Sequence, residues 1–252
     1  MVFDMKRNKV IDVPRFDNKS AELKRCIAFH EAGHATAIYL NNKARDLPPV
    51  FFQILFKDIK EASPEDFENA GHTVPGECIA KVEGGRLIQS LPHSMEALLE
   101  KITGQDDAMS RTVKDYVTAF DADIVNLLVG PLAEAKHVAE TDNELFNHRL
   151  VNINALKNYG GSSDIESAYE YLQSYSSNKQ QQDEKLNELF NVAFNFVNDH
   201  ENWKAISKLA GYIADSNKNT ISCEEVIAVL ESSNTIDFAH EMPQIDRRAA
   251  CA

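Results

Sequence analysis

Two histidines and a glutamate form the pattern in this sequence that is best suited to chemistry. His30, Glu31 and His34 follow the order H-E-x-x-H within a segment whose apolar residues recur at helical spacing. Residues four apart share one face of a helix, so both imidazoles can reach a single metal ion. Glu31 then lies beside the ion, where a general base for a metal-held water belongs. The pattern predicts a hydrolytic Zn²⁺ site, because zinc binds imidazole and carboxylate groups and keeps one position open for catalysis.

A catalytic zinc ion needs a third protein ligand. In the extended pattern H-E-x-x-H-x-x-G-x-x-H, that ligand is a histidine six residues after the second one. Ala37 and Leu40 stand where this pattern needs glycine and histidine, so it is excluded. An acid from a later helix is the other solution, and the chain has several candidates. The alternative interpretation of the motif is a pair of buried core histidines without a metal.

The segment that carries the motif is predicted to be a helix over residues 21–41, with Ser20 as its N-cap. The aromatic and β-branched run 50–56 is too short for a helix and predicts a strand. Residues 58–76 are rich in proline and acids and indicate a loop. Residues 77–88 alternate and then turn at two glycines, which is typical of a hairpin.

The second half of the chain is predicted to be helical. Gly130 and Pro131 interrupt one of its helices, so the proline should break that helix or begin a new one. Ser163 and Ser222 each begin a capping-box pattern at the start of a helix. The helices are expected at 98–103, 113–120, 124–137, 163–174 and 222–230, and the segment 183–215 is expected to be one long helix or a helix pair. The fold class that follows is mainly α with a small β element.

Three stretches resemble the FtsH-type zinc peptidases, peptidase family M41. Residues 26–36, CIAFHEAGHAT, are similar to the active-site helix of that family. Residues 126–134, NLLVGPLAE, are similar to its L-x-G-G-R-x-A-E segment, and residues 159–168, YGGSSDIESA, to its G-A-S-N-D-[IL]-x-x-A segment. Residues 202–210 resemble its closing helices. The resemblance implies a helical zincin fold over residues 21–235.

By this resemblance Asp164 is the third zinc ligand, with His30 and His34, and Glu31 is the catalytic base. Asp164 would sit at a helix start, where the helix dipole keeps a carboxylate ionised. Glu134 is the second candidate for the third ligand, or a partner of a ligating histidine. The strand 50–56 resembles the family's edge strand, so Phe52 and Ile54 are expected to contact an extended peptide. Core packing is the alternative role of these two residues.

The chain departs from the family in three respects. His34 and Asp164 are 130 residues apart, which implies an enlarged insertion at 58–120. Gly130 and Pro131 replace part of the Gly-Gly-Arg sequence. No phosphate-binding loop of the form G-x-x-x-x-G-K-[ST] occurs, so the expected enzyme works without ATP on peptides or unfolded polypeptides. A homo-oligomer and a separate ATPase partner are both compatible with the resemblance.

Composition limits the partners. The 252 residues carry a net charge of −13, which disfavours nucleic acid and anionic membranes. The four cysteines are scattered, and the sequence has neither a signal-like start nor an apolar run of 18 residues, so a cytoplasmic protein is expected. Residues 1–20 are expected to form an arm and residues 236–252 a tail.

Two other functions remain open from the sequence. A non-catalytic relative could use the same zinc-binding fold to bind a partner or to regulate, although Glu31 would then have no use. A structural zinc site is the weaker alternative, because such sites are usually closed sets of four Cys and His ligands. Cys26 is the one thiol near His30 in the sequence.

Overall fold

Two long helices, with a small sheet packed beside the first of them, organise the fold. The structure is a computed structural model that describes residues 15–56, 80–89, 91 and 107–232, and side chains from residue 21 and from residue 111 in the two long helices. In chain order the elements are α1 (Arg15–Ala44), β1 (Phe52–Phe56), β2 (Ala80–Gly84), α4 (Asp107–Thr141), the 3₁₀ helix η3 (Ala155–Tyr159), α5 (Ser162–Tyr175), α6 (Lys179–Asn198), α7 (His200–Asp215), β3 (Thr220–Ser222) and α8 (Cys223–Glu231). The predicted class, mainly α with a small β element, is confirmed.

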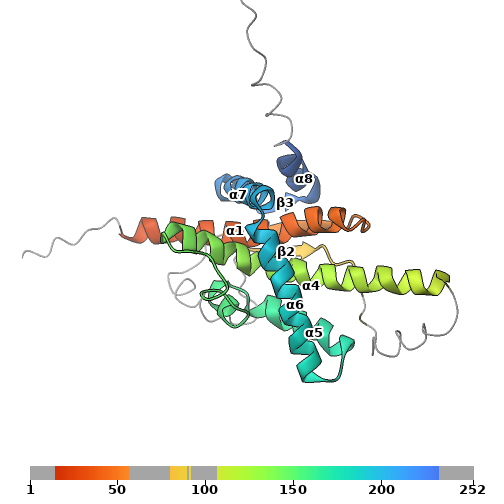
Figure 1. Cartoon of the computed structure of the whole chain (residues 1–252). Helices are drawn as coiled ribbons and strands as arrows, with labels where there is room; N and C mark the ends of the chain where they lie inside the picture. The colour runs from red at the N-terminus through yellow and green to blue at the C-terminus, as the bar shows by residue number, and fades with distance from the viewer. Residues whose placement is uncertain (1–14, 57–79, 90, 92–106, 233–252) are drawn as a thin grey trace, which may run out of the picture.

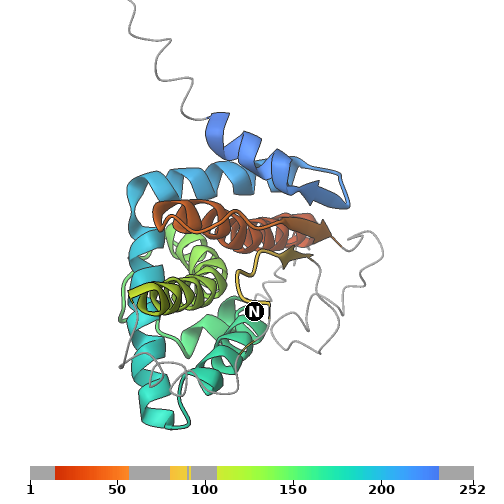
Figure 2. The ribbon, with the colours of Figure 1, turned by 90° about the vertical axis from the view of Figure 1, so that its right-hand side faces the viewer.

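Helices α1 and α4 lie side by side and run in opposite directions (Figure 1). Helix α7 packs on α1, and α6 crosses α4, so the pair is covered from two sides (Figure 2). The middle of α4 is apolar on nearly all of its faces, and Ile124, Val125, Leu128 and Leu132 are completely buried. A helix that is apolar all round belongs in the centre of a core. Helix α4 is therefore the central element on which α1, α5 and α6 pack.

Helix α4 is continuous across Pro131, whereas the sequence predicted an interruption. A proline inside a helix removes one backbone hydrogen bond and costs about 3 kcal/mol. Burial of Val129, Leu132 and Ala133 on both sides of the proline offsets that cost. The two helices predicted at 113–120 and 124–137 are accordingly one helix.

Helix α4 also passes a length and hydropathy test for a membrane span over Arg111–Thr141. Two thirds of the apolar window, 67%, is buried inside the protein. The core helix of a soluble protein meets the same test, so this feature is weak evidence for a membrane span.

The three strands form one antiparallel sheet in the order β2-β1-β3. Ile54 is paired with Val82 on one side and with Ile221 on the other. Residues 80–84 thus pair with β1 and form no hairpin within 80–88, because the chain leaves the sheet after Gly84. The predicted hairpin was wrong in its pairing, although a strand does lie there.

Helix boundaries differ from the prediction at three places. Ser20 lies inside α1, because residues 15–20 contain no glycine or proline that would stop the helix earlier. Helix α5 begins at Ser162 with Gly161 as its N-cap, so Ser163 makes no capping box. The segment 183–215 is a helix pair, α6 and α7, divided at Asp199, and α6 begins earlier than predicted, at Lys179. The capping box at Ser222 is confirmed, with Glu225 as its partner.

Several expected segments lie outside the described residues. They are the loop 58–76, the helix 98–103, residues 1–14 of the arm, the tail 236–252, and residues 58–79, 90 and 92–106 of the insertion 58–120.

Two neighbouring phenylalanines test how much the sheet contributes to stability. Phe52 is 1% exposed and Phe51 is 66% exposed. We expect Phe52→Ala to lower the free energy of unfolding by about 3–5 kcal/mol, since it leaves a cavity in the core. Phe51→Ala, the matched control, should change it by about 0.5 kcal/mol or less. Urea unfolding followed by circular dichroism measures both, and equal losses would contradict the burial of Phe52.

Candidate metal centre

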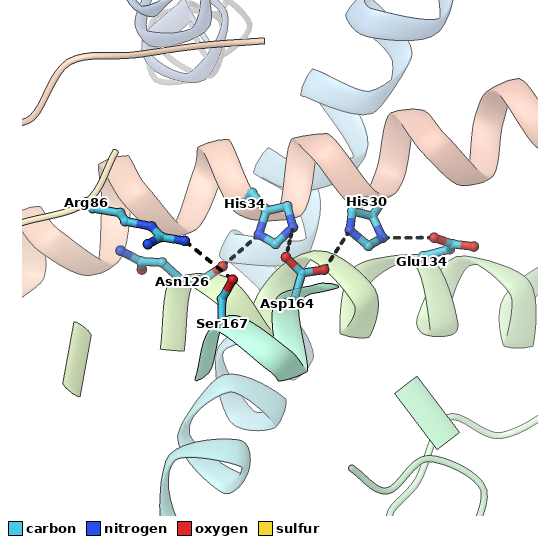
Figure 3. Close-up of polar contacts among 7 residues, drawn as sticks. All are labelled: His30, His34, Arg86, Asn126, Glu134, Asp164 and Ser167. Atoms are coloured by element: carbon cyan, nitrogen blue, oxygen red, sulfur yellow. Dashed lines mark hydrogen bonds and ion pairs between the residues drawn. The ribbon is translucent and has the colours of Figure 1, made fainter. Parts of the chain in front are cut away.

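The centre is formed where three helices meet. His30 and His34 lie one turn apart on the same face of α1, and Asp164 reaches them from the first turn of α5 (Figure 3). Asp164 Oδ2 is 3.3 Å from His30 Nε2, and Asp164 Oδ1 is 3.4 Å from His34 Nε2. One ligand atom from each residue lies within 4.8 Å of the others, so this group could hold a metal ion. No second such group occurs in the described part of the chain.

Hydrogen bonding on the far side of each ring orients the two histidines. His34 Nδ1 is 2.8 Å from the backbone oxygen of Asn126, and His30 Nδ1 is 2.9 Å from Glu134 Oε2. A carbonyl and a carboxylate only accept, so both Nδ1 atoms carry the proton. A neutral imidazole then presents a lone pair at Nε2, toward the carboxylate of Asp164. Lone pairs facing a carboxylate need a positive charge between them, which a metal cation would supply.

The spacing of the three groups is also that of a metal site. Two ligands at about 2.0–2.1 Å from one ion in tetrahedral geometry are themselves about 3.3–3.4 Å apart. The two Nε2 to carboxylate distances are 3.3 Å and 3.4 Å. The donor set of two imidazoles and one carboxylate therefore fits a divalent cation.

The pKa shifts of His30, His34 and Asp164 also favour a positive charge at the centre. Burial alone would lower the pKa of His30, but its contacts with Asp164 and Glu134 raise that pKa well above the ordinary value. Burial likewise opposes protonation of His34, and the charge of Asp164 outweighs it and raises the pKa. Burial would raise the pKa of Asp164, yet the two histidines hold it far below its usual range. All three shifts favour a positive charge between the two imidazoles and the carboxylate.

Glu31 occupies the position expected of a general base. Its side chain is buried, and burial raises the pKa of its carboxyl group, while the nearby histidines oppose this. The backbone N–H of Val82 in β2 hydrogen-bonds to the carboxylate. Glu31 Oε2 is buried and has no hydrogen-bond partner among the described residues. A carboxylate oxygen in that state has the capacity to bind a water beside the metal centre.

Glycines let the three helices approach closely enough to form the site. A Cβ on Gly33 would lie 2.8 Å from both the Ala133 side chain and the Val129 backbone oxygen, so α1 and α4 touch here without side chains between them. A Cβ on Gly130 would come within 3.0 Å of three atoms of the His34 ring. Gly160 has φ +70°, a conformation that favours glycine, and turns the chain into α5 beside His30.

The Gly130 and Pro131 pair, which interrupts the apolar pattern of the sequence, helps to build the centre. Gly130 leaves room for the His34 imidazole, as a glycine must. Pro131 packs against Gly161, whose own Cβ would lie 2.7 Å from the proline Cβ. This contact seats the start of α5, and with it Asp164, on α4.

Asn126 has no predicted role in the sequence, yet it contacts one of the two histidines. Its backbone oxygen accepts from His34, while its side chain accepts from Asn41 Nδ2 at 3.0 Å and donates to Asn42 Oδ1 at 3.1 Å. All three asparagines are buried. The network ties the end of α1 to α4 and holds the carbonyl against His34. A lone asparagine in the apolar run NLLVGPLA was the available signal.

Glu134 lies on the Nδ1 side of His30, away from the three ligand atoms. The structure therefore gives it the place of a partner to a histidine, and Asp164 the place in the group that could hold a metal. Cys26 is not part of that group. Burial raises the pKa of its thiol to about 11, so it would be a poor thiolate ligand.

The prediction that 50–56 is an edge strand was wrong. Strand β1 is the central strand, with β2 on one side and β3 on the other, so its backbone groups are already paired. Phe52 and Ile54 are buried at 1% and 0% exposure and belong to the core. They are therefore not placed to contact an extended peptide. Among the described strands, β2 is the edge strand that faces Glu31, through Val82.

Comparison with known proteins adds no assignment to this geometry. No protein-family model matches the chain, and no match is found among curated proteins.

Proposed function

We propose that this protein is a zinc metallopeptidase that works without ATP and hydrolyses peptide bonds in short or unfolded polypeptides. The observation that carries the proposal is the buried carboxylate of Glu31, with an unpartnered oxygen, one residue from a ligand of a metal-binding group. A site that only binds a metal needs no such carboxylate. The proposed fold is that of the FtsH-type peptidase domain, supported by the order of the three motifs on α1, α4 and α5.

His30, His34 and Asp164 would hold the zinc ion. Once bound, zinc would polarise the scissile carbonyl and make water more acidic. Glu31 would accept the proton of the attacking water and deliver it to the leaving amine. Burial of Glu31 excludes bulk water. It would strengthen the electrostatic interaction between the carboxylate and the attacking water, since charges act more strongly in a low dielectric.

The substrate strand would lie along β2 and not along β1. Strand β2 has no neighbour on its outer side among the described residues, and Val82 in it contacts Glu31. When an extended peptide is added to such an edge, the backbone groups of the peptide and of the strand form hydrogen bonds with each other. These bonds do not depend on the side chains of the peptide. Substrates would therefore be flexible or unfolded segments. The net charge of −13 disfavours nucleic acid as a partner of the proposed enzyme. The proposed location is the cytoplasm.

Metal removal tests this function directly. The purified chain is treated with a chelator, dialysed and reloaded with zinc, and cleavage of an unfolded polypeptide and of a peptide library is followed by mass spectrometry. We expect cleavage with zinc, loss of at least about 100-fold of the rate without it, and recovery on reloading. Zinc bound at one equivalent with no cleavage at all would favour the non-catalytic alternative.

A further inference from the structure

Arg86 is a cation next to the metal centre that the proposed chemistry does not use. Figure 3 shows it on the side of His34 away from His30, against Ser167 of α5. Ser167 is one helical turn after Asp164, so it lies on the same face of α5. Arg86 Nη2 is 3.4 Å from Ser167 Oγ. The guanidinium thus stands one helical turn from a proposed zinc ligand.

The backbone around Arg86 is fixed from both sides. Gly84 and Gly85 before it have φ +85° and +77°, so the chain turns sharply off the end of β2. A Cβ on Gly85 would clash with the Ile38 side chain, so this turn is packed on α1. After Arg86, the N–H groups of Leu87 and Ile88 both donate to Asp123 at 2.9 Å. The position of Arg86 is therefore set by the fold.

The charge of Arg86 is available for a ligand. Its guanidinium lies 5.8 Å from the centre of the Tyr171 ring, and within the described part of the chain its one hydrogen bond to a side chain is the bond to Ser167. The residue is exposed, and no carboxylate of the described residues forms an ion pair with it. An arginine that spends one N–H donor on a hydroxyl keeps its other donors for a planar, bidentate partner such as a carboxylate.

The groups around the centre are mostly acidic, so a cation there changes which substrates could bind. Three carboxylates, those of Glu31, Glu134 and Asp164, surround the centre, and the whole chain has a net charge of −13. A carboxylate on a substrate would be repelled here unless a cation faced it. Arg86 follows β2 directly, so a peptide along the edge of β2 would pass it within a few residues of Glu31.

We propose that Arg86 is a specificity-determining residue that binds a carboxylate of the substrate close to the scissile bond. This inference rests on the proposed function of the same site. The carboxylate comes either from an Asp or Glu side chain or from the C-terminus of the peptide. These sources share one chemistry, and the arms of the experiment separate them.

Binding to a protein without catalysis provides the test. Full-length Glu31→Gln protein loaded with zinc is titrated with fluorescent decapeptides in which one position at a time is Asp, Asn or Lys, each as free acid and as C-terminal amide. We expect the Asp peptide to bind about tenfold more tightly than the Asn peptide at one or two positions, or the free acid than the amide. When Arg86→Gln is introduced into the Glu31→Gln protein, the ratio of the two affinities should fall to near one. The affinity for the amidated Asn peptide should stay unchanged.

Matched variants separate charge from structure. Arg86→Lys should keep part of the preference, since it retains the charge but not the planar fork, and Arg86→Glu should shift it toward Lys peptides. Lys81→Gln removes a cation from β2 itself, where it pairs with Glu83, and should leave the ratio unchanged.

Several results would overturn the inference. They are the absence of any preference for a carboxylate, a preference that persists in Arg86→Gln, and an equal loss of affinity for all peptides with a lower melting temperature. The last would mean that Arg86 only fastens the segment after β2 to α5. Cleavage of neutral peptides by the wild type, measured in parallel, reports on the proposed function independently of this ratio.

Discussion

Replacement of Glu31 by glutamine is expected to reduce peptide hydrolysis by about 10²–10⁴-fold while zinc stays bound. The amide has the same shape as the carboxylate but cannot accept a proton, so it removes the general base alone. Glu31 is not one of the three residues whose ligand atoms form the metal-binding group, so the group remains complete. The measurement is the rate of cleavage of a library-derived peptide, with zinc content determined by atomic absorption on the same preparation.

The stability of the variant must be measured as well, because Glu31 is buried. Burial raises the pKa of the carboxyl group, so the charged form is held at a cost in free energy. The glutamine variant should therefore unfold at the same temperature as the wild type or at a higher one. A variant that keeps its fold, its zinc and its full rate of cleavage would show that Glu31 is not the base and that the proposed mechanism is wrong.

The arrangement of the centre could be predicted from the sequence where it depends on local spacing. His30 and His34 share a face because four residues make about one helical turn, and this needs no knowledge of the rest of the fold. Asp164 comes from another helix, so spacing alone left several acids open. The resemblance singled it out, and the structure brings it to the two histidines.

What the sequence could not predict depends on packing between distant segments. The central place of β1 follows from its pairing with β3, more than 160 residues later in the chain. An apolar strand looks the same at an edge and at a centre, so substrate contact and core packing were both possible roles of Phe52 and Ile54. The continuity of α4 through Pro131 also depends on tertiary contacts, since local propensity favours a break.

Gly130 likewise has a role that depends on packing between distant segments. In the sequence it looked like part of a helix break, since glycine and proline together commonly end a helix. In the structure it is a space for the imidazole of His34, a function that becomes visible only when α1 and α4 are brought together. The residue therefore connects the helix crossing to the metal centre, and its substitution has a large expected effect.

Substitution of Gly130 by alanine is expected to weaken zinc binding by on the order of 100-fold or more. A Cβ there would come within 3.0 Å of the Nε2, Cε1 and Cδ2 atoms of His34, and no real Cβ contact is that short. The ring would have to leave its place, which breaks its 2.8 Å contact with the Asn126 oxygen and moves Nε2 away from Asp164. Loss of an oriented ligand costs at least as much affinity as loss of a residue that orients it.

Gly211 in α7 offers a matched control, because a Cβ on it meets nothing within 4 Å. Gly211→Ala should leave zinc affinity unchanged and raise the free energy of unfolding by about 0.5–1 kcal/mol, as expected for alanine in an exposed helix. Isothermal titration with zinc and thermal unfolding without zinc measure the two effects separately.

Asp164→Asn, which keeps the shape but loses the charge of the third ligand, should resemble Gly130→Ala in zinc affinity but not in packing strain. If Gly130→Ala bound zinc as tightly as the wild type, the ion would not be held by Nε2 of His34, and the ligand set inferred from the three residues would be wrong.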